Sequence, residues 1–221
     1  MSSYLKIIYM LLGLPKTIYF NFKYFNFCDA IKFPVILSHR VVLSKTKGTV
    51  MIEAPIKTGM IRMGFGGVRI FDRKHSRSVW YLMGRVTFKG RASLGYGTRV
   101  SVFGDLTFGD SFAISAQTQI VCNYKITFGD GVLIGWDCLF MDSDAHKILN
   151  EDKEIVNVPK EIIIGDRVWM GAACKITKGT VIGNDVVVAT NSCVYGKHTT
   201  SNCVIGGNPV RIIKTGITWE I

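Results

Sequence analysis

The chain has 221 residues, of which 48% are hydrophobic, and carries a formal net charge of +11 at pH 7. This length fits one sizeable domain with an appendage. The hydrophobic fraction excludes a disordered chain, and 23 Gly with only 5 Pro suit β-structure with tight corners.

The positive charge is concentrated in the N-terminal part. Residues 1–100 hold 17 Lys or Arg and three acidic residues, whereas residues 101–221 hold 10 and 13. The net charges of +14 and −3 indicate an anionic partner for the first part, either a membrane surface or a lipid-linked phosphosugar. We expect no nucleic acid partner, because the sequence lacks a basic-aromatic RNA motif and a helix-turn-helix pattern. A solvated charged face remains an alternative.

Residues 1–34 form a basic, aromatic N-terminal segment. Lys6, Gly13 and Pro15 interrupt it well short of the about 20 apolar residues that a membrane span needs. It also lacks the pattern of a signal peptide. We expect one or two short helices that cap the following domain, rest at a membrane interface, or do both. The expected location is the cytoplasm, with peripheral contact to the inner face of the membrane.

The six cysteines contain no Cys-x-x-Cys pair, which favours reduced thiols over disulfides or a metal cluster. Three of them occur within a repeat, at positions that small apolar residues occupy elsewhere.

Hexapeptide repeats dominate the rest of the chain. An unbroken run covers residues 164–193, and in each unit the first residue is apolar, the second is mostly Gly or Ala, and the fifth is small or β-branched. Further units begin at Leu94, Val100, Phe108, Ile114, Phe128, Ile134, Phe140 and Val194. A period of six fits neither a helix nor an ordinary strand, and three units make one coil of a β-helix. We therefore predict a β-solenoid over residues 35–214 with irregular first coils and a tail at 215–221.

The repeat slips by two residues before Phe108 and before Phe128, and it is interrupted over residues 141–161 by polar and charged residues. The slips predict small insertions at corners. The interruption predicts a loop thrown out from the solenoid, and loops on rigid scaffolds are where chemistry tends to reside.

His146, at the start of that loop, is a candidate general base. A neutral imidazole, with a pKa of about 6.5, suits the removal of a hydroxyl proton at physiological pH. Asp144, two residues earlier, is positioned to orient the ring if both side chains share one face of a strand. The alternative for a lone His in a polar loop is a solvated side chain.

Three motifs together carry a resemblance to a known family: Asp144-Ala-His146, Ile164-Gly-Asp-Arg-Val-Trp-Met-Gly171 and Gly207-Asn-Pro-Val-Arg211. They resemble the hexapeptide-repeat acyltransferases, a superfamily that contains galactoside, maltose and xenobiotic acetyltransferases. The N-terminal segment is most similar to the branch that O-acetylates bacterial polysaccharides. The resemblance implies an all-β fold, a left-handed parallel β-helix, and a homotrimer with active sites between subunits.

The implied activity is acetyl-CoA-dependent O-acetylation of a sugar hydroxyl on a cell-surface polysaccharide or its lipid-linked precursor. His146 would act as the base for direct attack, with Asp144 as its partner, acetyl-CoA as co-substrate and no metal. The family's cofactor-binding positions fall on Trp169, Gly171, Ala172, Ala189, Thr190, Lys197, Arg211 and Lys214, and a position that related enzymes use for the sugar acceptor falls near Ser115.

Several of these residues have simpler interpretations. Trp169 is also typical of a packing residue, and Lys214 of a solvated tail. Galactoside acetyltransferases carry Thr-Lys where this chain has Tyr195-Gly196, which leaves Lys197 as the substitute.

Three other functions stay open. The same base would serve N-acetylation of an amino sugar. A zinc enzyme of the γ-carbonic anhydrase type would need three His, and of the four present only His146 lies in the central coils. A non-catalytic structural solenoid is the third alternative.

Overall fold

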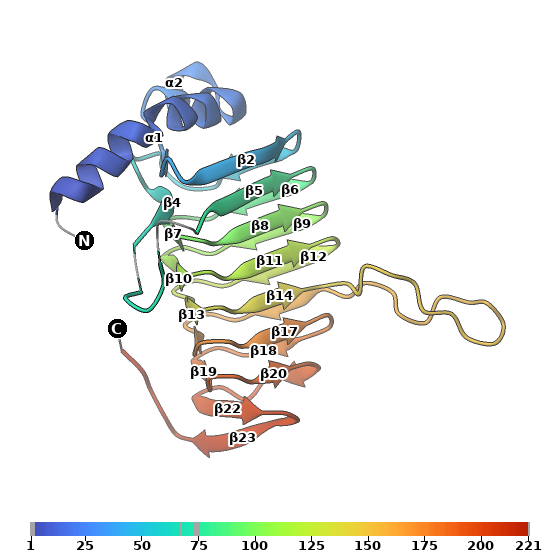
Figure 1. Cartoon of the computed structure of the whole chain (residues 1–221). Coiled ribbons are helices and arrows are strands. Elements are labelled where there is room, and N and C mark those ends of the chain that lie inside the picture. The colour runs from blue at the N-terminus through green and yellow to red at the C-terminus, as the bar shows by residue number, and fades with distance from the viewer. Residues whose placement is uncertain (1–2, 67, 73–75, 221) are drawn as a thin grey trace.

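The computed structural model describes residues 3–66, 68–72 and 76–220. Two N-terminal helices, α1 (Ser3–Tyr24) and α2 (Phe27–Ala30), precede a stack of triangular coils built from three sheets (Figure 1).

Each sheet forms one wall of the solenoid. Sheet A contains β1 (Val35–Leu37), β4 (Ile61–Phe65), β7 (Ala92–Gly95), β10 (Phe112–Ala116), β13 (Leu133–Trp136), β16 (Trp169–Met170), β19 (Val186–Val188), β22 (Cys203–Gly207) and β23 (Val210–Thr215). Sheet B contains β2 (Val41–Thr46), β5 (Ser78–Leu82), β8 (Arg99–Val102), β11 (Gln119–Cys122), β14 (Leu139–Met141), β17 (Lys175–Thr177) and β20 (Cys193–Val194). Sheet C contains β3 (Thr49–Ile52), β6 (Arg85–Phe88), β9 (Asp105–Phe108), β12 (Lys125–Phe128), β15 (Ile162–Ile164), β18 (Val181–Ile182) and β21 (Lys197–His198).

The register of the sheets follows the hexapeptide repeat. Strands three apart along the chain pair in parallel, so that Leu94, Ile114 and Ile134 lie one above another. The first residues of all the predicted units point into the core and are at most 3% exposed. The fifth residues of most units, including Thr118, Cys138 and Cys174, are buried as well, whereas Asp144, the fifth residue after Phe140, is exposed at the start of the loop. The predicted parallel β-helix is therefore confirmed.

Aromatic rings stack along the interior of sheet C. The ring centroids of Phe88 and Phe108 are 5.1 Å apart, and those of Phe108 and Phe128 are 5.7 Å apart. Burial of such large side chains supplies much of the stabilisation of a core. Three successive coils place a Phe at this position, and each ring is covered by the ring of its neighbour, so that no single coil would bury its ring alone.

The corner between sheets C and A carries a ladder of side-chain oxygens. The Asp110 carboxylate accepts the Arg91 N–H at 2.7 Å, Asp130 accepts the Asp110 N–H at 2.7 Å, and Asp166 accepts the Asp130 N–H at 2.8 Å. Asn184 continues the ladder by accepting the Asp166 N–H. The Asp of the Ile164-Gly-Asp motif therefore satisfies a backbone donor of the neighbouring coil.

The corner between sheets B and C holds the insertions. Residues 103–104 and 123–124 turn this corner, which places the two-residue slips of the repeat here. Glycine is required where coils meet closely, because a Cβ on Gly104 would lie 1.9 Å from the carbonyl oxygen of Tyr124. In the next coil the same corner opens into the loop that carries His146.

Helix α1 covers the open end of the first coil. The Asn21 side chain donates to the Val35 carbonyl at 2.7 Å and accepts the Val35 N–H at 3.1 Å, and Thr17 accepts the Leu37 N–H at 3.0 Å. The ammonium of Lys16 donates to two further carbonyls of the first coil. These side chains pair backbone groups that would otherwise form an open strand edge.

The sequence predicts one or two short helices here, but α1 has 22 residues and continues through Gly13 and Pro15. The side chain of Phe20, buried against Trp80 at 5.5 Å between ring centroids, anchors the helix by tertiary packing. A Cβ on Gly13 would lie 2.1 Å from the Leu37 carbonyl oxygen, so this glycine permits the close approach of helix and coil. Within the described part of the chain, no helix is long and apolar enough to cross a membrane.

The far end of the solenoid is closed by β23, which pairs antiparallel with β22. The tail then runs back along the coils, as Figure 1 shows, and the Ile217 N–H donates to the Asn202 carbonyl at 3.1 Å.

Candidate active site

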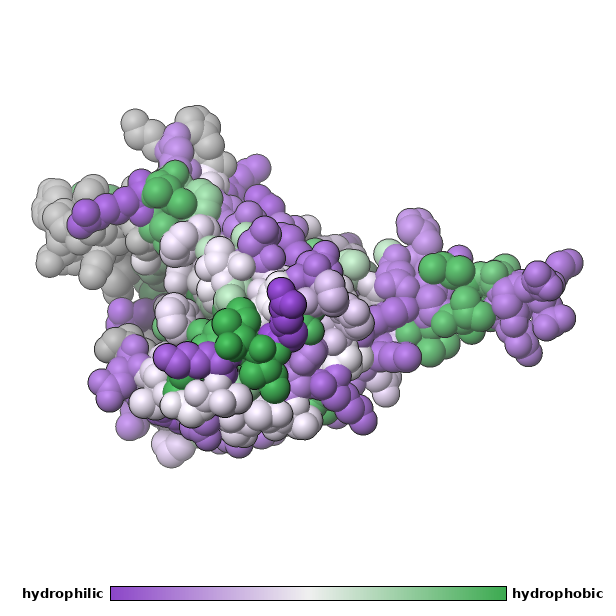
Figure 2. Space-filling view, turned by 90° about the horizontal axis from the view of Figure 1, so that it is seen from below, coloured by the Kyte–Doolittle hydropathy of each residue, from purple (hydrophilic) through white to green (hydrophobic). Residues whose placement is uncertain are grey.

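The loop between β14 and β15 forms an arm that projects from the solenoid (Figure 1). Its two strands meet at an antiparallel bridge between Leu149 and Ile155, and the Val156 N–H donates to the Ile148 carbonyl at 2.9 Å. Figure 2, viewed along the solenoid, shows a patch of apolar residues on this arm. Its exposed apolar side chains are Ile148, Leu149, Ile155, Val156 and Val158.

The base of the arm is fixed to the preceding coil. Asp142 is fully buried, and its carboxylate accepts the N–H groups of Asn123 at 2.8 Å and Tyr124 at 2.9 Å. The Asn123 side chain donates to the Ser143 hydroxyl at 2.7 Å. At the other end of the arm, the Lys160 N–H donates to the Asp142 carbonyl at 3.0 Å. A buried carboxylate paired in this way holds the start and end of the arm in one place.

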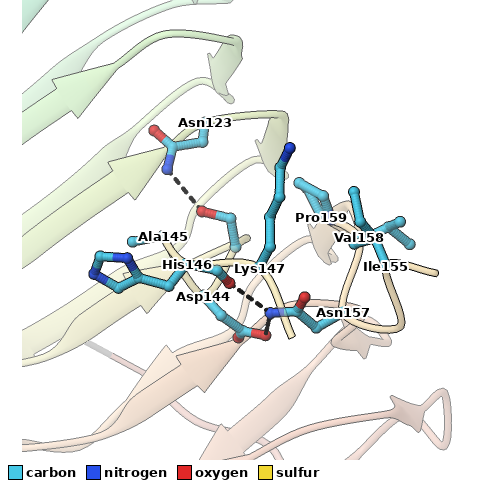
Figure 3. Close-up of a pocket in the computed structure, with 10 residues that line it drawn as sticks. Asn123, Asp144, Ala145, His146, Lys147, Ile155, Asn157, Val158 and Pro159 are labelled. Atoms are coloured by element: carbon cyan, nitrogen blue, oxygen red, sulfur yellow. Dashed lines mark hydrogen bonds between the residues drawn. The ribbon is translucent and has the colours of Figure 1, made fainter. Parts of the chain in front are cut away.

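His146 follows a sharp turn at Ala145, which adopts a φ of 63°. The Asn157 amide from the opposite strand of the arm donates to the His146 carbonyl at 2.7 Å and to the Asp144 carboxylate at 2.9 Å. Figure 3 shows these bonds and shows the His146 ring directed away from the Asp144 carboxylate. The backbone that carries His146 is therefore held from both sides.

The Asp144 carboxylate does not contact the His146 ring that it was expected to orient. Its carboxylate pairs with the ammonium of Lys178, which also donates to the Asn157 carbonyl at 3.1 Å. The Lys178 ammonium, followed by the Asn157 amide, holds the pKa of Asp144 below its ordinary value. The turn at Ala145 separates the two side chains, so the assumption of one strand with a common face is wrong, and Asp144 anchors the arm.

A pocket of about 280 Å³ adjoins this turn, just below the range of about 300–1,000 Å³ for small-molecule sites. Its lining combines the anchoring amides with apolar groups of the arm: Asn123, Ser143, Asp144, Ala145, His146, Lys147, Ile155, Asn157, Val158 and Pro159 (Figure 3). The sequence gives no sign of the roles of Lys178 and Asn157, because a Lys within a repeat and an Asn in a loop are ordinary surface residues.

The residues predicted to bind the pantetheine arm lie together at another edge. Trp169 stands on β16 with 40% of its surface exposed. Ala172 and Thr190 occupy the corner between sheets A and B in successive coils, where the Asn191 N–H donates to the Ala172 carbonyl at 2.8 Å. A Cβ on Gly171 would lie 2.6 Å from the Thr190 hydroxyl, so packing alone requires this glycine.

Ala189 follows β19 in the same column of coils, and Ser115 lies on β10 of the same sheet. Two further aromatic residues lie here, and no motif in the sequence marks them. Trp136, at the end of β13, is exposed on a neighbouring coil. Trp219 of the tail packs on Trp169 with 6.1 Å between ring centroids and donates its indole N–H to the Arg167 carbonyl at 2.8 Å.

The basic residues predicted to bind phosphate are separated. Lys197 lies on β21 in sheet C, whereas Arg211 and Lys214 lie on β23 at the edge of sheet A. All three are exposed. The latter two are therefore on the same sheet as Trp169, and Lys197 is on a different wall.

His146 and Trp169 also lie on different sides of one chain. His146 leaves from the corner between sheets B and C, and Trp169 belongs to sheet A, the wall opposite that corner (Figure 1). Within the described residues, no three His, Cys, Asp or Glu side chains gather as a metal-binding group.

No family model matches the sequence. A lipopolysaccharide biosynthesis O-acetyl transferase, putative by name, of Escherichia coli K12 is 31% identical over 142 residues, which cover 59% of this chain and 72% of the relative. The chain belongs to the hexapeptide-repeat acyltransferase superfamily. The galactoside O-acetyltransferase of the same organism is 31% identical over 121 residues, 54% of this chain and 55% of the relative.

Among solved structures, the polysialic-acid-specific acetyltransferase NeuO covers 85% of this chain and 82% of its own, with a TM-score of 0.53 and 23% identity. This likeness concerns the fold. The solenoid is thus the left-handed parallel β-helix of the hexapeptide-repeat acyltransferases.

Proposed function

We propose that the protein transfers an acetyl group from acetyl-CoA to a sugar hydroxyl. The observation that carries the proposal is the anchored turn at His146, where Asn157, Asp144 and Lys178 hold the backbone of a candidate base beside a pocket. The superfamily membership supports acetyl transfer, and the names of the relatives support an O-linked sugar acceptor.

The proposed reaction is direct transfer. A ring nitrogen of His146 accepts the proton of the acceptor hydroxyl while its oxygen attacks the thioester carbonyl. The carbon–sulfur bond of the tetrahedral intermediate then breaks, the acetyl ester remains on the sugar, and the leaving thiolate takes the proton from the imidazolium. Placing both substrates together supplies much of the acceleration, and no covalent acyl-enzyme is needed.

The proposed cofactor groove runs over sheet A. The indole of Trp169 would form an apolar wall beside the thioester, and the backbone at Gly171, Ala172, Ala189 and Thr190 would approach the pantetheine. Arg211 and Lys214, exposed on β23 of the same sheet, would face the phosphates, where Arg suits bidentate contacts. Lys197 lies on another wall, so a phosphate contact from it would require the adenine end to cross a corner.

We propose that the active site is shared between subunits of a homotrimer. In one chain His146 and the proposed cofactor groove are on opposite sides of the solenoid, which supports a site that a neighbouring chain completes. The arm that carries His146 exposes apolar side chains, which suits burial against a neighbour (Figure 2). The proposed acceptor is a bacterial surface polysaccharide or its lipid-linked precursor, in the cytoplasm.

The experiment that tests the proposal is calorimetric titration of acetyl-CoA into the wild type and His146→Ala, with thiol release measured over a panel of sugars and amino sugars. We expect both proteins to bind acetyl-CoA and only the wild type to turn over. His198→Ala is the matched control and should retain turnover. Absence of acetyl-CoA binding to the wild type would refute the enzyme proposal and favour a structural solenoid. Turnover with amino sugars alone would show that the acceptor is an amino group and not a hydroxyl.

A further inference from the structure

Helix α1 presents apolar side chains on two opposite faces. Residues two apart on an α-helix point about 200° apart. Phe20 is buried against the solenoid, so Ile18 and Phe22 point away from it, and they are 41% and 44% exposed. Acetyl transfer does not use this outward face, which begins four coils from the coil of His146.

The outward apolar face is continuous. Leu14, Ile18 and Phe22 follow one another at four-residue spacing, and Leu11 extends the row. The row continues onto α2, because the rings of Phe22 and Phe27 lie 6.1 Å apart and Phe27 is 69% exposed. We call this surface the end face: Leu11, Leu14, Ile18, Phe22, Phe27 and Ile31. Contiguous apolar surface of this kind marks an interaction site, unlike single exposed residues.

Helix α1 lies at the end of the solenoid (Figure 1). The end face is on the side of α1 away from the first coil, because Phe20 and Asn21 on the opposite side are buried. No described segment of the chain covers it, because each of its side chains is more than two-fifths exposed. The occupant must therefore come from outside the described part of the chain.

Basic residues surround the end face. Lys23 is on α1 and Lys32 is in the turn after α2. Lys45 and Lys47 flank Thr46, whose hydroxyl lies 3.0 Å from the Tyr19 hydroxyl of α1. All four lysines are exposed. Within residues 1–60 there are eight Lys or Arg and only two acids, Asp29 and Glu53. Asp29 is occupied by Lys32 and Asn26.

We infer that the end face docks on the surface of an anionic lipid bilayer. The apolar row would enter the headgroup boundary, with α1 lying in the membrane plane, while the lysines contact lipid phosphates. Charge complementarity selects this occupant over a second copy of the chain, because two cationic faces repel each other. The inference goes beyond the proposed function and does not depend on it.

The test is sedimentation of the full-length protein with two kinds of vesicle, one of equal parts phosphatidylglycerol and phosphatidylcholine and one of phosphatidylcholine alone. We expect the wild type to bind the anionic vesicles at least tenfold more tightly, with binding weakened by added salt. Failure of the wild type to bind anionic vesicles at low salt would refute the inference.

Two sets of variants locate the surface. Ile18→Ser with Phe22→Ser should reduce binding at least tenfold without changing net charge. The matched control, Phe103→Ser with Tyr124→Ser, removes two equally exposed aromatic residues from the corner between sheets B and C and should bind as the wild type does. Lys45→Gln with Lys47→Gln leaves the helix intact and should lower both the affinity and its salt dependence. The two lysine substitutions therefore test the inference even if the helix variant fails to fold.

Light scattering on the same proteins tests the alternative that a second copy of the chain covers the end face. If Ile18→Ser with Phe22→Ser lowers the oligomeric mass and leaves vesicle binding unchanged, the end face is a contact between chains and the inference is wrong. An unchanged mass with lost vesicle binding supports the bilayer.

Discussion

The N-terminal and C-terminal coils share one cross-section but differ in what their corners carry. Leu94, Ile114 and Ile134 follow at intervals of 20 residues, whereas Ile164 and Ile182 are 18 apart. The two additional residues of the earlier coils lie at the corner between sheets B and C, and the arm with His146 leaves from that same corner. A corner outside the core accepts insertions of any length because the buried positions on both sides keep their register.

The two parts also differ in charge, since the excess of basic residues belongs to the first 100 positions, whereas the candidate base and the candidate cofactor-binding residues belong to the last 80. The comparison indicates a division of labour along one uniform scaffold. In the proposed arrangement, the N-terminal coils and their helix would meet an anionic surface, and the C-terminal coils would hold the cofactor and the base.

The largest effect should come from separating the two halves of the shared site. His146→Ala and Trp169→Ala should each lower turnover by about 10²-fold or more. Co-expression of the two variants should restore about a quarter of wild-type activity, because random mixing places an intact His beside an intact Trp in about one site in four. The measurement is thiol release by the purified mixture.

A control fixes the interpretation of that mixture. Wild type co-expressed with a chain that carries both substitutions should also give about a quarter of full activity if sites are shared, but about half if each site lies within one chain. No recovery in the first mixture would contradict the shared site.

Removing the anchor of the arm should have the next largest effect. Lys178→Met breaks the pair with Asp144 and one bond to Asn157, so the His146 backbone loses its register. We expect turnover to fall about 10- to 100-fold, as for small misplacements of catalytic groups, with acetyl-CoA affinity unchanged. Lys153→Met at the arm tip is the control. Equal turnover in both variants would show that the anchor is dispensable.

Tight stacking in the N-terminal coils should appear as a stability cost. Gly104→Ala places a Cβ against the Tyr124 carbonyl, and such overpacking costs about 1–3 kcal/mol. Gly196→Ala in a C-terminal coil has nothing within 4 Å and meets only the strain of its positive φ. We therefore expect a larger fall in Tm for Gly104→Ala. Equal falls would show that the coils separate freely at this corner.

A smaller effect should follow from Trp219→Ala. This change removes the ring that packs on Trp169, and such an aromatic contact contributes about 0.5–1.5 kcal/mol. If that contact holds Trp169 in its binding position, the KM for acetyl-CoA should rise roughly two- to tenfold. Tyr195→Ala, an exposed aromatic residue away from this contact, is the control. A lower KM would mean that the tail obstructs the groove.

The smallest effect concerns pH. The pKa of Asp144 is lowered in the folded protein, so its contribution to stability is present above its unfolded pKa of about 3.9 and is lost as the pH falls through the lowered folded value. The difference in Tm between the wild type and Asp144→Asn should therefore stay constant from pH 8 to pH 5 and shrink as the pH falls below about 4. A difference that does not shrink in acid would contradict this contribution.

The core could be predicted from the sequence because each hexapeptide from Leu94 to Val194 places its first residue inside, and most place the fifth there too. The position of the arm could be predicted from the break in the repeat, but its conformation could not. That conformation depends on hydrogen bonds of Asn157 and Lys178, which no sequence motif marks. The length of α1 could not be predicted, because contacts with the first coil override Gly13 and Pro15. The contact of Trp219 with Trp169 also depends on the path of a tail without any repeat.

The spacing of the coils gives the protein a fixed height. Neighbouring strands are about 4.8 Å apart, so the coil of His146 stands about 19 Å from the first coil, and the helix adds about 10 Å. With the end face on a bilayer and the axis upright, the base sits roughly 30 Å above the headgroups. An enzyme whose base is held at this height would acetylate the outer sugars of a lipid-anchored glycan. The sugar nearest the lipid would be out of its reach.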